Sequence, residues 1–190
     1  MYLGERIVLI RLSPEGAIKV KKRKLTPIYA KKKGKDMPLK YIQIGVGGFG
    51  HYWCASVMSR LIDMGVAEPV AIADINRESL VKAQKLMGLP DNCIYENAAK
   101  AFEKHKADFA IIVVPPAYHE EMVSLAVKYG CHILSEKPIA DTIEACCRIY
   151  KKVKNAGLKM AVTMSHRFDQ DKQSLEAAVK SGSYGRLNYI

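Results

Sequence analysis

Residues 45–50 read Gly-Val-Gly-Gly-Phe-Gly. It contains the pattern Gly-x-Gly-x-x-Gly. It follows a short apolar run at 41–45 and precedes a segment at 51–64 whose apolar residues recur with helical spacing. A glycine-rich turn between a strand and a helix is the context in which this pattern gains meaning. The stretch therefore predicts a loop that binds the phosphates of a dinucleotide.

Each glycine of the loop has an expected task. Gly45 permits the tight turn, Gly47 lets the main chain approach a diphosphate, and Gly50 lets the helix pack close to the strand. The start of the helix offers free N–H groups and a partial positive charge to the phosphates. Gly48 and Phe49 lie within the same turn, so we expect them to contact the cofactor as well.

The rest of the chain alternates between strands and helices. Strands are expected at 41–45, 68–73, 108–114, 131–135 and 158–164, and helices at 51–64, 77–87, 97–106, 117–129 and 141–155. Strands joined by helices of this length imply right-handed crossovers and a parallel sheet covered on both faces. The fold class is therefore α/β, a doubly wound parallel sheet of the Rossmann dinucleotide-binding type, over residues 37–165. The helix at 141–155 begins with Asp141 or Thr142 as its N-cap.

Asp74 ends the second expected strand, 24 residues after Gly50. A carboxylate at this place can accept hydrogen bonds from the adenosine ribose and would repel a 2′-phosphate, which favours NAD over NADP. Arg77 lies three residues further on and could instead receive that phosphate, so NADP stays possible. Asp74 could also serve as N-cap for the helix that begins near Asn76.

Composition places the chain among ordinary globular proteins and locates its excess charge. The net charge is +11, and residues 1–40 alone hold 12 Lys or Arg against 3 Asp or Glu. A basic extension can bind nucleic acid or an anionic membrane. This one lacks interleaved aromatic residues, so a solvated tail is favoured, and neither nucleic acid nor membrane is expected as a partner. Five cysteines without a Cys-x-x-Cys pair, and no visible secretory signal, favour the reducing cytoplasm and no metal site.

Residues 1–36 differ in character from the rest of the chain. They are expected to be a basic extension, disordered or a mis-assigned start, with a possible hairpin around residues 13–16. Lys33-Gly34-Lys35 requires purine-rich codons like those of a bacterial ribosome-binding site, which leads to the hypothesis that Met37 is the natural start. N-terminal sequencing of the natively expressed protein tests this hypothesis.

Two further motifs follow successive strands. Pro115-Pro116-Ala117-Tyr118-His119 comes after the apolar strand at 108–114, and Ser135-Glu136-Lys137-Pro138 ends the next. The carboxyl ends of parallel strands line the ligand crevice of such sheets. Lys137 is therefore expected to point towards the nicotinamide end of the cofactor.

These motifs together resemble the Gfo/Idh/MocA oxidoreductases, the glucose-fructose oxidoreductase and inositol dehydrogenase family. The resemblance rests on residues 45–50, Asp74, residues 115–119, Glu136-Lys137-Pro138, and the element His166-Arg167-Phe168. It implies an enzyme that acts on CH–OH groups, moving a hydride between nicotinamide and a hydroxyl-bearing carbon of a sugar or cyclitol. The alternative is a dinucleotide-binding module without catalytic activity.

The resemblance also implies roles for individual residues. Lys137 would contact the reacting hydroxyl and help to move its proton, and Glu136 would help to place the lysine and the cofactor. Pro138 would fix the local turn, through a peptide bond that is often cis in the family. The remaining residues expected beside the nicotinamide and its ribose are Pro115, Pro116 and His119.

Two histidines leave alternatives open. His119 could act as a catalytic acid, although a structural hydrogen bond at a helix start is favoured. His166, with Arg167, could reach the substrate pocket, although a boundary position between two domains is favoured.

The family has a second, α+β domain built on an open antiparallel sheet, which supplies substrate contacts and the oligomer interface. Residues 166–190 resemble the linker helix, at 170–180, and the first strand, at 187–190, of that domain. The chain is therefore expected to be truncated, to fold its Rossmann half and to turn over poorly or not at all. The full-length form is expected to be a homo-oligomer.

Overall fold

The computed structural model describes residues 6–12, 18–24 and 37–186. The chain divides into two units, Met1–Asp36 and Met37–Ile190. In the first unit, β1 (Arg6–Leu12) pairs with β2 (Ile18–Lys24) as an antiparallel hairpin, in agreement with the hairpin expected around residues 13–16, which themselves lie outside the described ranges.

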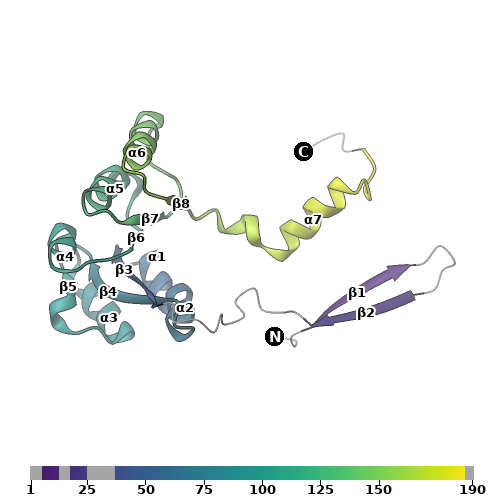
Figure 1. Cartoon of the computed structure of the whole chain (residues 1–190), viewed down its shortest axis with the longest axis horizontal. Coiled ribbons are helices and arrows are strands. Elements are labelled where there is room, and N and C mark those ends of the chain that lie inside the picture. Colours follow the sequence, from purple (N-terminus) through teal and green to yellow (C-terminus); the bar gives the residue numbers. More distant parts are fainter. Residues whose placement is uncertain (1–5, 13–17, 25–36, 187–190) are drawn as a thin grey trace. The chain divides into compact units, whose positions relative to one another are not determined.

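The second unit is built on one sheet of six parallel strands in the order β5-β4-β3-β6-β7-β8 (Figure 1). The strands are β3 (Leu39–Ile44), β4 (Ala67–Ala73), β5 (Ile94–Tyr95), β6 (Phe109–Ile112), β7 (His132–Ser135) and β8 (Met160–Val162). The chain winds from β3 in one direction through β4 and β5, and then in the other direction through β6, β7 and β8. The predicted doubly wound Rossmann sheet is thus confirmed, with its switch point beside β3.

Helices connect the strands and cover both faces of the sheet. They are α1 (Phe49–Tyr52), the π-helix η1 (Trp53–Met58), α2 (Ser59–Asp63), α3 (Arg77–Met87), α4 (Ala98–Lys104), α5 (His119–Lys128), α6 (Ile143–Asn155) and α7 (Gln170–Lys180). Short 3-10 turns complete the chain at η2 (Asp91–Cys93), η3 (Pro116–Tyr118) and η4 (Ser165–Phe168). The N-cap of α6 is Thr142, whose hydroxyl accepts from the N–H of Ala145.

The core lies on both sides of the sheet because successive residues of β3 point to opposite faces. Ile42 and Ile44 enter a cluster with buried residues of α4, α5 and α6. Tyr41 faces the other side, where residues of η1, α2 and α3 pack. This two-sided burial explains why β6 reads as a continuous apolar run.

The structure differs from the expected elements in two places. The sheet has a sixth strand, β5, which the sequence analysis missed because two residues are too short to show a period. The helix expected at 51–64 begins at Phe49 and includes the π-helical segment η1. The strand expected at 187–190 lies outside the described residues. Within the described part of the chain, no helix is both long and apolar enough to cross a bilayer.

Candidate active site

The loop at the carboxyl end of β3, residues 45–50, is called the glycine loop. Gly45 has φ +84°, and a Cβ at this position would lie 2.0 Å from the carbonyl oxygen of Val113. A Cβ at Gly50 would lie 2.3 Å from the carbonyl oxygen of Gly45. Both positions therefore require glycine, for the turn and for the close approach of helix and strand that the sequence predicts.

The other two glycines face more open surroundings. A Cβ at Gly47 would meet the Ser79 hydroxyl oxygen at 2.9 Å, whereas a Cβ at Gly48 would meet nothing within 4 Å. Gly48 is the N-cap of α1, and no side chain caps the helix there. Phe49, at the first helical position, is exposed and stacks on Tyr52. The outer side of the glycine loop is thus bare main chain at a helix start, a surface suited to an anion.

A buried glutamine supports the glycine loop from within the sheet. Gln43 is fully buried in β3, and its Nε2 donates to the carbonyl oxygens of Gly45 (3.0 Å) and Gly50 (2.9 Å). One amide group therefore ties both ends of the loop. Gln43 was not among the predicted site residues, although a single polar side chain within the buried run Tyr41–Ile44 was the available signal.

Asp74 braces the glycine loop from the neighbouring strand. Its Oδ2 accepts from the N–H groups of Val46 (2.8 Å) and Gly47 (3.0 Å), and its Oδ1 accepts from the N–H of Asn76 (2.9 Å). A carboxylate offers about four lone-pair positions, so one further hydrogen bond can be accepted. The N-cap of α3 is Asn76, which accepts from Ser79, so the N-cap alternative for Asp74 was wrong.

Arg77 is the first residue of α3. Its Nη1 lies 3.9 Å from Glu96 Oε1, and both side chains are 60% exposed. Such an exposed and long contact is weak. The guanidinium can therefore turn towards other partners at the same edge of the sheet.

His119 joins the segments that follow β6 and β7. The ring is fully buried, its Nε2 lies 2.9 Å from the carbonyl oxygen of Val114, and its Nδ1 lies 3.2 Å from that of Ile139. Pro115 and Pro116 lie between the end of β6 and α5. A neutral ring can donate to only one of these two carbonyl oxygens, and with both ring nitrogens facing main-chain carbonyl groups this geometry favours the structural alternative for His119 over the catalytic one.

Residues 136–139, called the lysine loop, follow β7 and begin with a buried acid. Glu136 is 9% exposed; its Oε1 accepts from Trp53 Nε1 (2.9 Å) and its Oε2 accepts from the main-chain N–H of Lys137 (3.0 Å). The Lys137 side chain is exposed, and it takes part in none of the ion pairs found among residues 37–186. The Lys137–Pro138 peptide bond is cis, as the resemblance implied.

The sheet brings these segments to one edge. Ile44 pairs with Ala73 of β4 on one side and with Ile112 of β6 on the other, and Ile112 pairs with Ser135 of β7. Neighbouring strands lie about 4.8 Å apart, so the ends of β3 and β7, with β6 between them, are roughly 10 Å apart. Asp74, the glycine loop, the two prolines and the lysine loop therefore follow one another along the carboxyl edge.

His166 and Arg167 lie in η4, beyond the edge strand β8. His166 is exposed, and its Nδ1 lies 2.7 Å from Asp169 Oδ2. Among the described residues, no hydrogen bond or ion pair joins either side chain to Lys137. Because β8 pairs in parallel with β7, η4 nevertheless follows the same carboxyl edge of the sheet as the lysine loop.

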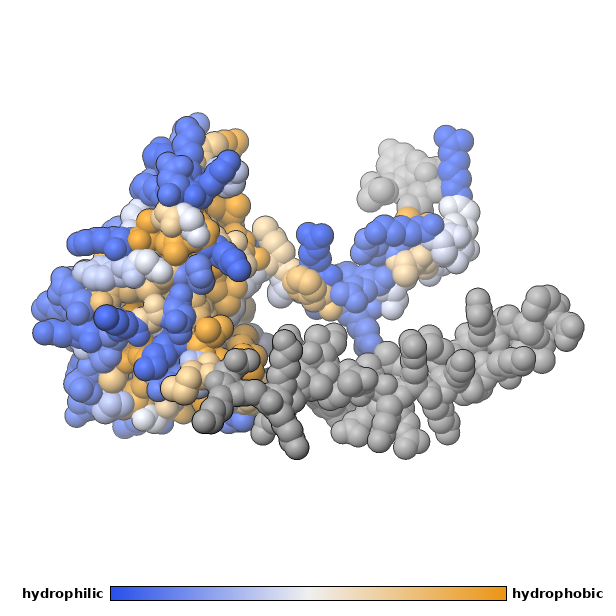
Figure 2. All heavy atoms as spheres, viewed as in Figure 1, coloured by the Kyte–Doolittle hydropathy of each residue, from blue (hydrophilic) through white to orange (hydrophobic). Residues whose placement is uncertain are grey.

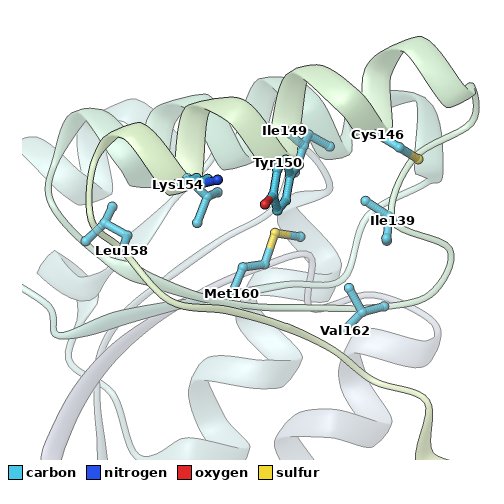
Figure 3. Close-up of a pocket in the computed structure, with 9 residues that line it drawn as sticks. Ile139, Cys146, Ile149, Tyr150, Lys154, Leu158, Met160 and Val162 are labelled. Atoms are coloured by element: carbon cyan, nitrogen blue, oxygen red, sulfur yellow. The ribbon is translucent and has the colours of Figure 1, made fainter.

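A groove of about 440 Å³ lies elsewhere, between α6 and β8 (Figure 3). It is lined mainly by apolar side chains, and Figure 3 shows Met160 reaching towards Tyr150 across it. Hydrophobic surface is visible in the space-filling view on the side of the second unit where α6 and β8 lie (Figure 2). None of the expected cofactor or catalytic residues lines this groove, although Ile139, the last residue of the lysine loop, does.

Comparison with known proteins agrees with this geometry. The model of an oxidoreductase family with an NAD-binding Rossmann fold matches residues 39–164. The chain is 48% identical over 154 residues to the uncharacterised protein y4oX of Sinorhizobium fredii, covering 81% of this chain and 43% of that protein. It is 30% identical over 149 residues to 1-carboxy-3-chloro-3,4-dihydroxycyclohexa-1,5-diene dehydrogenase of Comamonas testosteroni, covering 78% and 37%.

Among solved structures, scyllo-inositol dehydrogenase from Lactobacillus casei, with bound NAD(H) and scyllo-inositol, superposes with a TM-score of 0.70 at 23% identity. The match covers 78% of this chain and 42% of that one, and at this identity it supports the fold alone. The chain thus spans less than half the length of these three proteins. Because the family model covers most of the chain and the fold agrees, the chain belongs to the Gfo/Idh/MocA oxidoreductase family with an NAD-binding Rossmann fold.

Proposed function

We propose that the chain is the cofactor-binding half of an NAD-dependent dehydrogenase that acts on a hydroxyl-bearing carbon of a sugar or cyclitol. The observation that supports it most is the arrangement along the carboxyl edge of the sheet. A bare glycine loop and an exposed lysine follow strands that have only β6 between them. A dinucleotide is long enough to span this separation of roughly 10 Å.

In this proposal the chain's own residues hold the two ends of the cofactor. Main-chain N–H groups around Gly48 would face the diphosphate, and the free lone pair of Asp74 would accept from the adenosine ribose. Pro115 and Pro116 would lie beside the nicotinamide end, after β6. Bound NAD would supply the ring that exchanges the hydride with the substrate.

We favour NAD over NADP for an electrostatic reason. The Asp74 carboxylate is fixed by three main-chain N–H groups, so it cannot easily swing away from an added 2′-phosphate. Arg77 is the side chain that could offset this repulsion, because its contact with Glu96 is long and exposed. NADP therefore stays the second choice.

Lys137 is the residue that would accept or donate the proton of the substrate hydroxyl group. Oxidation of an alcohol to a carbonyl removes a hydride and the hydroxyl proton, and a neutral amine can accept that proton; the ammonium form returns it in the reverse direction. Glu136 would act behind the lysine by holding its main-chain N–H. His166 and Arg167 enter the proposal only as substrate contacts that would need η4 to approach the lysine loop.

The names of the relatives support the proposed substrate class. The relative from Comamonas testosteroni is named for a dihydroxylated six-membered carbon ring, and the Lactobacillus casei enzyme was crystallised with scyllo-inositol, a cyclitol. We further propose a homo-oligomeric full-length form in the reducing cytoplasm without a nucleic-acid partner. The free, buried thiols of Cys54, Cys93 and Cys131 fit a reducing compartment.

Two measurements test the proposal. The chain has a single tryptophan, Trp53, just after the glycine loop, so energy transfer from this residue to reduced nicotinamide reports NADH binding. A titration with NADH, competition by NAD⁺ and a parallel titration with NADPH come first, followed by turnover with NAD⁺ and a panel of sugars and cyclitols. Binding with turnover supports the dehydrogenase. Binding without turnover favours the cofactor-binding module, and failure to bind NADH overturns both.

A further inference from the structure

Trp53 lies between the two halves of the candidate site. It is the first residue of η1, three positions after the last glycine of the glycine loop, and it is 5% exposed. Its indole packs in a cluster with Ile111 of β6 and, at the margin, Leu134 of β7. The indole therefore extends from the helix that follows β3 towards the strand that carries the lysine loop.

The polar edge of the indole makes the link specific. Trp53 Nε1 donates to Glu136 Oε1 at 2.9 Å, and Glu136 Oε2 accepts from the main-chain N–H of Lys137 at 3.0 Å. These two donors engage both carboxylate oxygens of a nearly buried side chain. Removing one donor would leave a buried acceptor without a partner, which costs more than the hydrogen bond itself contributes. The carboxylate would then move towards solvent and release Lys137.

We propose that Trp53 is a positioning residue for Lys137, acting through Glu136, and that it couples occupancy of the glycine loop to the placement of the lysine. The coupling follows from where Trp53 stands. Any ligand that orders the start of the helix at Gly48 also orders Trp53 five residues later, and with it the acceptor that holds Lys137. Such coupling is reciprocal, so order in the lysine loop also favours the ligand. The coupling rests on the proposed function, whereas the chain of hydrogen bonds does not.

The single tryptophan permits a clean experiment. In a tryptophan auxotroph, replacement of all tryptophan by β-(3-benzothienyl)alanine changes position 53 alone, exchanging N–H for sulfur with little change of shape. The same procedure with 5-fluorotryptophan keeps the N–H and is the matched control. Hydrogen exchange of single amides by NMR is the measurement, with the amide of Lys137 as reporter. The amide of Glu136, which donates to the Ile112 carbonyl in the sheet, is the internal reference.

The expected result is a change in the hydrogen-exchange rate of one amide but not of its neighbour. Loss of the indole N–H should speed exchange at Lys137 by about tenfold, the size of one hydrogen bond to a charged group, and leave Glu136 unchanged. Saturation with ADP, which fills the diphosphate site but has no nicotinamide to cover the lysine, should slow exchange at Lys137 with 5-fluorotryptophan but not with the sulfur analogue. The variant Trp53→Phe should repeat the effect of the analogue.

Other outcomes overturn the inference. Equal exchange at Lys137 with both analogues, or equal acceleration of both amides, would mean that Trp53 acts only through packing. An ADP effect that persists without the N–H would remove the coupling. If ADP and NADH do not bind at all, the proposed function and the coupling fail together, while the comparison without ligand still decides whether Trp53 positions Lys137.

Discussion

The glycine loop and the lysine loop end two strands of one sheet, yet they are held in different ways. Gln43 holds the glycine loop from within the sheet, Asp74 from the side, and the backbone packs so closely that side chains are excluded at Gly45 and Gly50. The lysine loop is anchored at Glu136, but Lys137, the proposed proton-transfer group, is an exposed side chain. Binding a diphosphate needs fixed main chain, whereas moving a proton needs a side chain with some freedom, and substitutions should therefore act differently in the two loops.

The largest expected effect is that of Gly45→Ala. The added Cβ would meet the Val113 carbonyl oxygen at 2.0 Å in a backbone with φ +84°. Left-handed strain of about 1–2 kcal/mol and overpacking of about 1–3 kcal/mol add up to a loss of roughly 2–5 kcal/mol in the free energy of unfolding. Urea unfolding followed by Trp53 fluorescence measures this loss.

The matched control for that change is Gly48→Ala. Its φ is also positive, at +47° with ψ −118°, so backbone strain remains, but the added Cβ would meet open space, so the overpacking of about 1–3 kcal/mol is absent. Equal stability of the two variants would contradict the argument that close packing, and not only backbone strain, requires glycine at position 45.

The second prediction concerns Lys137→Met in the lysine loop. Because this side chain is exposed and forms no ion pair among residues 37–186, stability should change by less than about 0.5 kcal/mol. NADH affinity should stay within about threefold, while turnover of any substrate that the chain accepts should fall by about 100-fold or more, as expected for loss of a proton-transfer group. A marked loss of stability would show that the lysine is structural. Unchanged turnover would show that another group moves the proton.

The contrast between the loops also explains what could be predicted from the sequence. The glycine loop, Asp74 and the alternation of strands and helices follow from local patterns, and their places in the chain were predicted, apart from the short strand β5. The hydrogen bond between Trp53 and Glu136 joins residues 83 positions apart, so no local sequence pattern indicates it. Gln43 could have been noticed as a polar residue in a buried strand, but its two carbonyl partners depend on how the loop folds back.

A third prediction tests whether Asp74 only supports the glycine loop or also selects the cofactor. In Asp74→Asn, one amide oxygen must replace two carboxylate oxygens that accept three main-chain N–H groups. NADH affinity should fall by about tenfold, roughly the value of one hydrogen bond to a charged group, and the preference for NADH over NADPH should shrink. Parallel titrations of both cofactors measure this. Asp63→Asn, at the end of α2, is the control and should leave both affinities unchanged. A tenfold loss of NADH affinity with unchanged discrimination would mean that Asp74 supports the loop but does not select the cofactor.

The smallest expected effect lies away from both loops, in the helices that follow β6 and β7. Glu120 of α5 accepts from Arg148 and Lys152 of α6, and these partners, Arg148 first, lower its pKa to about 2. An unfolded glutamate titrates near 4.3, so the ion pairs stabilise the fold fully above that pH, and this contribution is lost as the pH falls through 2. Glu120→Gln should therefore flatten the decline in stability between about pH 5 and 2, by a modest amount because the partners are exposed. Thermal unfolding at several pH values measures this, and NADH affinity at pH 7 should not change. A drop in NADH affinity would mean that the packing of α5 on α6 also holds the segments that bind the cofactor. The lysine loop, which precedes α6, would then depend on its surroundings as strongly as the glycine loop does.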